Sequence, residues 1–343
     1  FIKLYLFIKM QKNSIKEMIK YSSMVLFSTF LGISVANAAT KWSAYTYAPS
    51  VKLPSAAHLE KMASEMSDAT GGELELQANL GGSLPIKVPD IGQAVADGVI
   101  QLGFDAYFQG FIPTGAAQRM PMLIVNDTEY DLAMLKVMMP HMKKKYAEAG
   151  ITLLGSYTYP LTVTYSRSPV TRLSDLAGRK IRVLSQAGGE FVKAFDGVPV
   201  NMSTPEVSTS LQQGVVDAIH AATAGGGQLW GPLVDHKYEL GPNYVNVYLI
   251  ANTESYEALS DSTKAVVASM VGMLGEEVKL EMRASVDAIN KQHIEAGMTI
   301  TAAHPDDVAA MQAAMIPVWN KWADDTGDEA KDVLADLKEL LGR

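Results

Sequence analysis

The chain alternates between segments with helical spacing and segments with strand-like spacing of apolar residues. Residues 54–70 have apolar side chains at helical intervals and stop at Gly71 and Gly72, after which leucines alternate with acids in "ELELQAN". Further helical stretches near 88–97 and 128–149 lead into the apolar runs "VIQLGF" and "ITLLG". Helices that alternate with strands in this way predict an α/β fold with a mainly parallel sheet.

The central segment contains three predicted strands joined by two helices. The strands are "KIRVL", "VPVNM" and "VVDAIH", the last of which ends at His220. Between the second and third strands, Thr204 precedes a proline at the first helical position, so a helix is expected to begin there. In doubly wound sheets ligands bind beyond the carboxyl ends of the strands, which points to the residues that follow Arg182, Met202 and Ile219.

A long helical pattern follows the strand-like segment 244–252. It begins near Ser260 and can extend to Ala296, a length of about 54 Å at 1.5 Å per residue. A helix of this length exceeds one small domain and predicts an element that connects two lobes. Gly272 and Gly275 weaken the helical pattern, so two helices with a break near Gly275 remain an alternative.

The first 38 residues differ in kind from the rest of the chain. They contain five lysines and one acid, followed by the uncharged run "MVLFSTFLGISV" and the small-residue sequence "ANA". This combination predicts a secretory signal peptide that is cleaved after Ala38. The apolar run of 12 residues is too short to span a membrane. Because Phe1 is not an initiator, translation is expected to begin at Met10 or Met18.

Composition narrows the classes of partner. Of the 29 basic and 37 acidic residues in the chain, 24 and 36 lie outside the first 38, so the mature net charge is about −12. This charge argues against nucleic acid or an anionic membrane surface as a partner, although a local basic cluster can still bind a small anion. The absence of cysteine excludes a disulfide framework and a thiol nucleophile, and an exported acidic chain of this kind fits a periplasm.

A search for catalytic motifs finds none. The chain lacks a G-x-S-x-G elbow, H-E-x-x-H, a Walker loop and G-x-G-x-x-G, and its six histidines show no metal-ligand spacing. We therefore predict no enzyme activity, no metal and no cofactor. A secreted α/β hydrolase that uses His220 with Asp217 or Glu206 is the alternative from another class.

Arg182 is the strongest candidate for binding chemistry. It lies between Ile181 and Val183 in a predicted internal strand, and a buried guanidinium keeps its charge and matches a carboxylate through two hydrogen bonds. The alternative is a surface salt bridge, and Lys180 on the same face of the strand leaves both interpretations open. His220 ends a buried-looking strand, where a ligand hydrogen bond and a satisfied core histidine are about equally expected.

Two blocks of the sequence carry a family resemblance. The chain resembles the DctP-type solute-binding proteins of TRAP transporters in the order, the spacing and the identity of the residues of two blocks, "SDLAGRKIRV" (174–183) and "VPVNMSTPEVSTSLQQGVVDA" (198–218). The resemblance implies a periplasmic-binding-protein-like α/β fold of two doubly wound lobes, with a hinge and one long helix that spans both. The expected division is the signal peptide at 1–38, lobe I at 39–159 and 248–286, and lobe II at 160–247 and 287–343.

The resemblance also implies a function. Such proteins capture a small organic acid between the lobes and deliver it to the membrane permease subunits of a TRAP transporter, without inserting into the membrane themselves. The arginine that clamps the ligand carboxylate in this family corresponds to Arg182, and a residue that commonly lines the cleft corresponds to Thr204. A binding protein of an ATP-driven importer is the nearest alternative.

Departures from the family pattern predict the kind of acid. A second cleft arginine of some members falls on Thr162, and His220 and Ala221 replace the acid and the tryptophan with which others hold a cation, so no metal is expected. The loss of that arginine beside several tyrosines predicts a monocarboxylate with an apolar or aromatic body. The remaining candidate ligand contacts are Tyr107, Tyr157, Tyr159, Trp230, the stretch "YTYAPS" (45–50), and Asp105, for which a capping or hinge role is equally expected.

Overall fold

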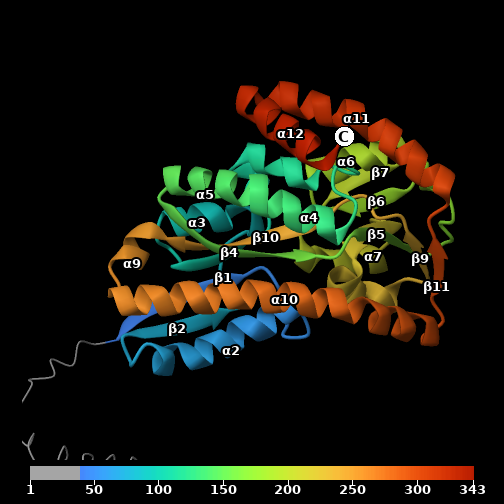
Figure 1. Ribbon diagram of the computed structural model, residues 1–343. Helices are drawn as coiled ribbons and strands as arrows, with labels where there is room; N and C mark the ends of the chain where they lie inside the picture. Colours follow the sequence, from blue (N-terminus) through green and yellow to red (C-terminus); the bar gives the residue numbers. More distant parts are fainter. Residues whose placement is uncertain (1–38) are drawn as a thin grey trace, which may run out of the picture. The chain divides into compact units, whose positions relative to one another are not determined.

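The computed structural model describes residues 39–343, so the predicted signal peptide lies outside the described residues. Two sheets with helices packed around them make up this part of the chain (Figure 1). The strand order is β2-β1-β3-β10-β4 in the first sheet and β11-β9-β5-β8-β6-β7 in the second. The predicted α/β class is therefore confirmed.

The first sheet is mixed. β1 pairs in parallel with β2 and β3, whereas β10 returns from late in the sequence and pairs antiparallel with both β3 and β4. The bounds of its strands are β1 (Thr40–Thr46), β2 (Leu74–Asn79), β3 (Leu102–Asp105), β4 (Ile151–Tyr159) and β10 (Val245–Asn252).

The second sheet contains the strands predicted from the centre of the sequence. β6 lies between β7 and β8 and is parallel to both, and β5 is antiparallel to β8 and β9. The bounds of its strands are β5 (Thr162–Ser166), β6 (Lys180–Val183), β7 (Val198–Asn201), β8 (Ala218–Ala222), β9 (His236–Glu239) and β11 (Thr299–Ala302).

Helices join and cover the strands. The α-helices are α2 (Pro54–Ala69), α3 (Ile91–Ala96), α4 (Asp127–Ala133), α5 (Met139–Glu148), α6 (Gln186–Ala194), α7 (Val207–Gln212), α8 (Gln228–Trp230), α9 (Thr253–Glu257), α10 (Asp261–Glu295), α11 (Pro305–Thr326) and α12 (Asp328–Leu341). Short 3₁₀ or π turns are η1 (Val88–Asp90), η2 (Phe108–Gly110), η3 (Pro113–Arg119), η4 (Met134–Met138), η5 (Leu173–Leu176), η6 (Thr204–Glu206), η7 (Thr223–Gly227) and η8 (Gly231–Leu233).

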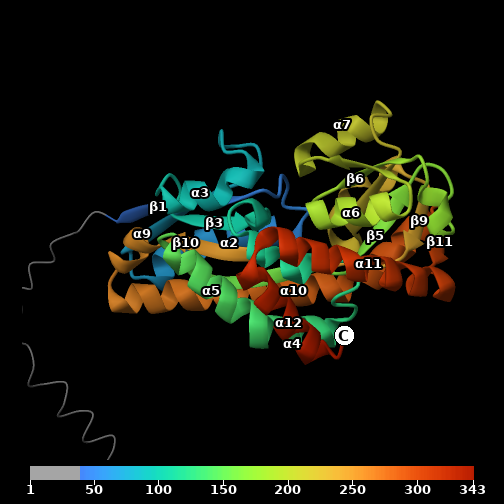
Figure 2. The same ribbon diagram turned by 90° about the horizontal axis from the view of Figure 1, so that it is seen from above.

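The chain crosses between the two sheets twice through short segments, and a third time through α10, which follows β10 and precedes β11. It leaves the first sheet after Tyr159 and enters the second at Thr162, and it returns between Glu239 and Val245. Two neighbouring crossings of this kind are the connection that a hinge between lobes requires. The predicted lobe boundaries themselves remain a prediction. α12, which belongs to the range predicted for lobe II, packs against η3, α4 and η4, whereas α11 contacts α6 (Figure 2).

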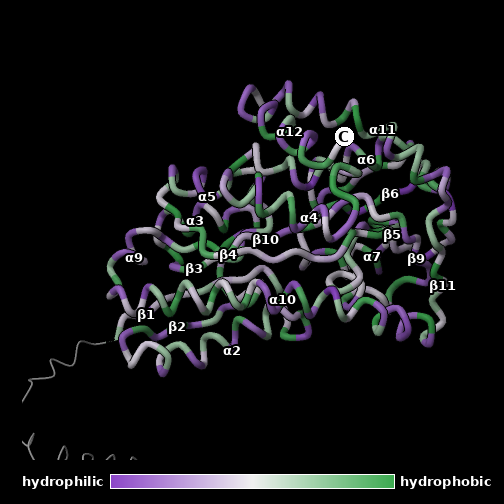
Figure 3. Tube along the Cα trace, in the orientation of Figure 1, coloured by the Kyte–Doolittle hydropathy of each residue, from purple (hydrophilic) through white to green (hydrophobic). Residues whose placement is uncertain are grey.

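α10 is continuous over its 35 residues, and it begins at its predicted place because the side chain of Ser260 accepts a hydrogen bond from the backbone nitrogen of Thr263. It packs against β4 of the first sheet and the helix α2, and farther along against β11 of the second sheet and the turn η7 (Figures 1 and 2). Along this helix hydrophobic and hydrophilic residues follow one another at helical spacing, so that one face of the helix is buried and the other is exposed (Figure 3).

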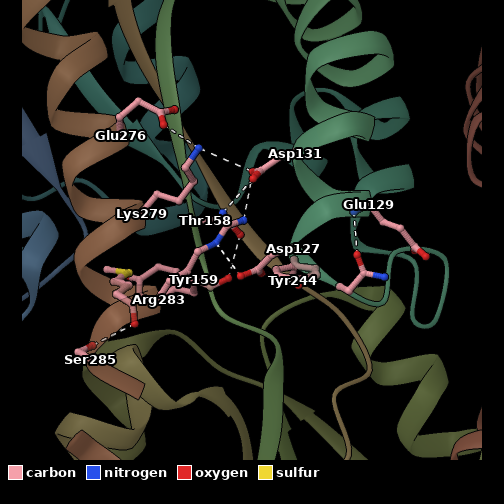
Figure 4. A network of polar contacts seen from close by, with 12 residues as sticks. Asp127, Glu129, Asp131, Thr158, Tyr159, Tyr244, Glu276, Lys279, Arg283 and Ser285 are labelled. Carbon is pink, nitrogen blue, oxygen red and sulfur yellow. Dashed lines mark hydrogen bonds and ion pairs between the residues drawn. The ribbon is translucent and has the colours of Figure 1, made fainter. Parts of the chain in front are cut away.

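A polar network fastens α10 to α4 beside the crossing from β4 to β5 (Figure 4). Arg283 of α10 contacts Asp127 through Nε at 3.1 Å and Asp131 through Nη1 at 2.9 Å. The hydroxyl of Tyr244, in the returning crossing, donates to Asp127 at 2.7 Å. The network therefore ties the long helix to one of the two crossings.

Asp307, near the start of α11, is a buried carboxylate that binds three partners around the second sheet. It accepts two hydrogen bonds from Arg172, both at 2.9 Å, one from the backbone nitrogen of Leu173 at 3.0 Å and one from the hydroxyl of Tyr238 at 2.6 Å. These donors, Arg172 above all, lower the pKa of Asp307 to about 2.

Replacing Asp307 with asparagine is expected to lower the free energy of unfolding at pH 7 by about 1–2 kcal/mol. The folded pKa of about 2 lies below the ordinary value of 3.8, so the carboxylate stabilises the fold above about pH 4 and loses this effect as the pH falls through 2. The expected loss of unfolding free energy is smaller than the full pKa shift would give, because the Arg172 side chain is 47% exposed and water screens the ion pair. Urea unfolding of both proteins should give a smaller difference at pH 3 than at pH 7, and equal stabilities at pH 7 would contradict the assignment.

Candidate functional site

One cavity, of about 70 Å³, draws side chains from both sheets. Tyr47, just after β1, and Tyr159, at the end of β4, form part of the wall on the side of the first sheet. On the other side the lining comes from the carboxyl ends of β6 and β8, where ligands bind in doubly wound sheets. Six of the singly predicted contact residues line this cavity, as does Tyr47 of the predicted stretch 45–50, whereas Tyr157 does not: the six are Tyr159, Thr162, Arg182, Thr204, His220 and Trp230.

Arg182 is 3% exposed, whereas Lys180, two residues earlier on β6, is exposed. Its Nε donates to the carbonyl oxygen of Met202 at 3.0 Å, and Nη1 lies 3.5 Å from the carbonyl oxygen of His220. Its Nη2 is buried and has no hydrogen-bond partner among residues 39–343. Burial lowers the pKa of Arg182, yet a guanidinium stays charged at neutral pH. A buried cation with an unused donor is therefore directed at the cavity.

His220 lies beside Arg182 and is neutral at pH 7. Its Nδ1 is 3.2 Å from the hydroxyl of Thr164, and its ring lies 4.9 Å from that of Phe191. Burial, together with the charge of Arg182, lowers its pKa to about 4. Its Nε2 is buried without a hydrogen-bond partner in the described part of the chain. The geometry thus favours a ligand hydrogen bond over a fully satisfied core histidine.

Aromatic rings form much of the cavity wall. The hydroxyl of Tyr47 donates to that of Tyr159 at 2.7 Å, and the ring of Trp230 lies 5.3 Å from the guanidinium carbon of Arg182. The glycine-rich stretch "AGGGQLW" fits closely against these rings: a Cβ atom at Gly225 would come within 2.7 Å of Tyr159, and one at Gly226 within 2.3 Å of Trp230. The glycines therefore let the backbone approach the aromatic walls.

The two threonines line the cavity in different ways. The hydroxyl of Thr162 donates to the carbonyl oxygen of Asn243 at 3.1 Å, so this side chain holds the two crossings together where the family pattern has an arginine. Thr204 is 9% exposed and begins η6, which is fixed by reciprocal bonds between Ser203 and Glu206. Thr204 therefore presents its side chain from a rigid turn.

Asp105 and Tyr107 do not line this cavity. Asp105 is 1% exposed and accepts hydrogen bonds from the hydroxyl of Tyr146 at 2.9 Å and from the backbone nitrogen of Tyr107 at 3.1 Å. Burial raises its pKa to about 6 against the effect of these bonds and of the charge of Arg119. For Asp105 the geometry favours the capping alternative. The hydroxyl of Tyr107 lies close to both Arg182 and Arg119, whose charges oppose the rise that burial causes in its pKa.

Arg119 lines the cavity and was missed by sequence reasoning. It is 0% exposed, lies 4.7 Å above the ring of Phe108, and donates through Nε and Nη2 to the side-chain and backbone oxygens of Asn246. One sequence signal could have indicated it, because Arg119 is the single charged residue between Asp105 and Asp127. A lone cation in an apolar segment is a candidate for burial with a specific partner.

Between residues 39 and 343 no group of three or more His, Asp or Glu side chains is arranged to hold a metal ion. Over the same part of the chain no helix combines the length and the apolar character needed to cross a membrane.

Comparisons with known proteins agree with this geometry. Residues 45–325 match family 7 of the bacterial extracellular solute-binding proteins, DctP. The chain is 26% identical over 278 residues to the ectoine-binding periplasmic protein TeaA of Halomonas elongata, covering 73% of this chain and 77% of TeaA. It is 24% identical over 266 residues to the ectoine/5-hydroxyectoine-binding periplasmic protein UehA of Ruegeria pomeroyi, covering 74% and 77%.

Solved structures share the fold. An extracytoplasmic solute receptor of Bordetella pertussis that binds pyroglutamic acid has a TM-score of 0.81 at 22% identity, with 88% of this chain and 100% of that chain covered. A TRAP periplasmic solute-binding protein of Desulfovibrio salexigens with bound orotic acid has a TM-score of 0.79 at 18% identity, with 88% and 99% covered.

The family match extends over well more than half of the chain, and solved structures of solute receptors share its fold. The family is periplasmic and consists of solute-binding receptors, not enzymes. The chain belongs to the family 7 bacterial extracellular solute-binding proteins, the DctP-type receptors of TRAP transporters.

Proposed function

We propose that this receptor captures a small monocarboxylate with an apolar or aromatic body. The observation that carries the proposal is Arg182, a buried cation whose hydrogen bonds go to backbone carbonyls and whose Nη2 has no partner within residues 39–343. A carboxylate is the natural acceptor for a guanidinium edge of this kind, because the pair forms parallel charge-assisted bonds. The rings of Tyr47, Tyr159 and Trp230 would enclose the body of the ligand.

The identity of the acid is supported by charge and by the relatives. His220 is neutral and the Thr162 hydroxyl is engaged with Asn243, so on this side of the cavity Arg182 supplies the net charge. Pyroglutamic acid and orotic acid, named for two structurally similar receptors, are ring compounds with one carboxylic acid group. The ectoine-binding relatives take a ligand of similar size.

The proposed mechanism is closure about the two crossings. An open arrangement exposes Arg182 to water, and the incoming carboxylate replaces that water with a charge-assisted pair. Closure then excludes solvent and strengthens the pair, because the dielectric constant around it falls. Ligand binding favours the closed state only if both sides of the cavity contact the ligand.

The proposal also covers how the receptor delivers its ligand and how the receptor itself is exported. The loaded receptor would dock on the membrane permease subunits of a TRAP transporter, and residues 1–38 would direct export with cleavage after Ala38. Service to an ATP-driven importer is the alternative. Genes for two membrane permease subunits next to this one favour the TRAP assignment, and a neighbouring ATPase gene favours the alternative.

Mass spectrometry of the ligand that co-purifies with the native receptor tests the proposal directly. We expect an organic acid with one carboxylate, and a thermal-shift screen of acids should identify the same class. A screen in which only dicarboxylates or sialic acids raise the melting temperature would contradict the monocarboxylate assignment. The N-terminal sequence of the exported protein tests cleavage after Ala38.

A further inference from the structure

Four buried polar atoms without hydrogen-bond partners in the described chain gather at one place. Three belong to residues that line the cavity: Nη2 of Arg182, Nε2 of His220 and Nη1 of Arg119. The fourth is the hydroxyl of Tyr107, close to both arginines. Buried donors and acceptors are nearly always satisfied in folded proteins, so such a cluster indicates groups that a ligand satisfies. A ligand carboxylate bound to Arg182 would satisfy only some of these four atoms.

Arg119 is held rigidly, which gives its unused nitrogen a defined direction. Nε lies 3.2 Å from Oδ1 of Asn246, Nη2 donates to the backbone oxygen of the same residue, and the guanidinium stacks over Phe108. With two of the three nitrogens fixed and the group planar, Nη1 cannot turn to another partner. Arg119 therefore presents a preorganised donor to the cavity.

The charges around Arg119 and Arg182 differ. Asp105 lies close enough to Arg119 that each charge shifts the pKa of the other, and with a pKa of about 6 it is mostly ionised at neutral pH. Arg182 is influenced by Glu206, which is exposed and therefore screened by water. The acid near Arg119 is thus buried with it, whereas the acid near Arg182 is exposed to water, so the positive charge of Arg182 is the less compensated of the two.

We infer that Arg119, beside Tyr47, forms a second polar subsite that takes a neutral oxygen acceptor of the ligand, a carbonyl or a hydroxyl, while Arg182 holds the carboxylate. This inference rests on the proposed function, because it assumes an acid on Arg182. It narrows the ligand to an oxo or hydroxy monocarboxylic acid. An acid without the second oxygen leaves Nη1 of Arg119 buried and unsatisfied, and a dicarboxylate brings one negative charge more than the cavity compensates.

The second subsite also supplies the contact that closure requires. Arg119 is anchored to Asn246 on β10 of the first sheet, and Arg182 belongs to β6 of the second. A ligand that spans the two arginines binds both sides of the hinge at once, so its affinity is specific for the closed state. The subsite therefore acts in both selectivity and closure.

Calorimetry with matched acids tests the inference. The probes are three pairs that differ in one oxygen function: cyclopentanecarboxylate and 3-oxocyclopentanecarboxylate, phenylacetate and mandelate, hexanoate and 5-oxohexanoate; glutarate represents dicarboxylates. For the pair that binds best, the wild type should prefer the oxygen-bearing member by roughly 10- to 100-fold. In Arg119→Met this preference should fall to within about threefold, while the apolar member keeps its affinity.

Because Arg119 is buried, Arg119→Met requires a companion that keeps the charge. Arg119→Lys keeps the charge but lacks the planar fork that bonds Asn246 through two nitrogens and fixes the direction of the third, so its preference should fall as well. Lys180→Met, which removes an exposed cation, should leave every ratio unchanged. An unchanged preference in both Arg119 variants, or glutarate as the tightest probe, would overturn the second subsite and leave the Arg182 anchor intact. No binding of any acid by the wild type would overturn the proposed function itself.

Discussion

Replacing Arg182 with lysine is expected to weaken binding of the co-purified acid by roughly 100-fold, about 3 kcal/mol, while the protein remains folded. Lysine keeps the positive charge but loses the planar pair of donors that matches a carboxylate. It also loses the separate Nε donor to the carbonyl oxygen of Met202, which fixes the direction of the guanidinium, so a lysine ammonium would meet the ligand without that anchor. Isothermal titration calorimetry with the identified acid measures the effect.

The matched control for this substitution is Lys180→Arg, two residues earlier on β6. Lys180 is exposed whereas Arg182 is buried, so a cation exchange at position 180 should leave affinity within about twofold of the wild type. Circular dichroism and thermal unfolding of both variants without ligand establish that any loss at position 182 is a binding effect. If Arg182→Lys keeps wild-type affinity, the carboxylate is not held by this guanidinium.

The comparison of these two cations shows what the sequence could predict about β6 and what it could not. Strand alternation places Lys180 and Arg182 on one face, and alternation alone leaves that face undecided. The difference arises because the carboxyl end of β6 is buried beside Met202 and His220, while its first residue, at the amino end of the strand, is exposed. Local signals predicted the strand and the turn at Thr204, and the sheet order determined the burial.

Sequence reasoning missed Arg119 for a different physical reason. It lies in η3, an irregular segment without helical or strand periodicity, and its partner Asn246 comes 127 residues later in the chain. The absence of an arginine at position 162 indicated a cavity with a single cation, but another arginine enters from a separate element. Long-range packing of this kind has no local signal apart from the lone charge itself.

Asp105 illustrates a different case, in which a local signal left two contacts open, a ligand group and a capping or hinge role. It ends β3 at the carboxyl side of the first sheet, the side on which ligands are expected. Its two oxygens instead accept bonds from Tyr146, which is contributed by α5, and from the backbone of Tyr107. The bond from α5, a helix far away in sequence, thus favours the capping alternative, which the sequence alone could not separate from a ligand contact.

Gly275→Ala is expected to destabilise the fold by about 3 kcal/mol, even though alanine is the better helix former. A Cβ atom at Gly275 would lie 2.6 Å from the carbonyl oxygen of Ser156 and 3.2 Å from its carbonyl carbon. These are backbone atoms of β4 and cannot turn away as a side chain could, so α10 or β4 must shift. Urea unfolding measures the change, and ligand affinity should fall too, because β4 carries Tyr159 into the cavity wall.

The matched control is Gly272→Ala, three residues earlier in the same helix. Its nearest neighbour across the interface would be the carbonyl oxygen of Leu154 at 4.0 Å, so alanine fits without strain and should stabilise the helix by about 0.5–1 kcal/mol. Two identical substitutions in one helix are thus expected to change stability in opposite directions. In the sequence both glycines weaken the helical pattern equally, and only the close approach of β4 separates them. If both variants are stabilised, α10 does not pack this closely on β4 in solution.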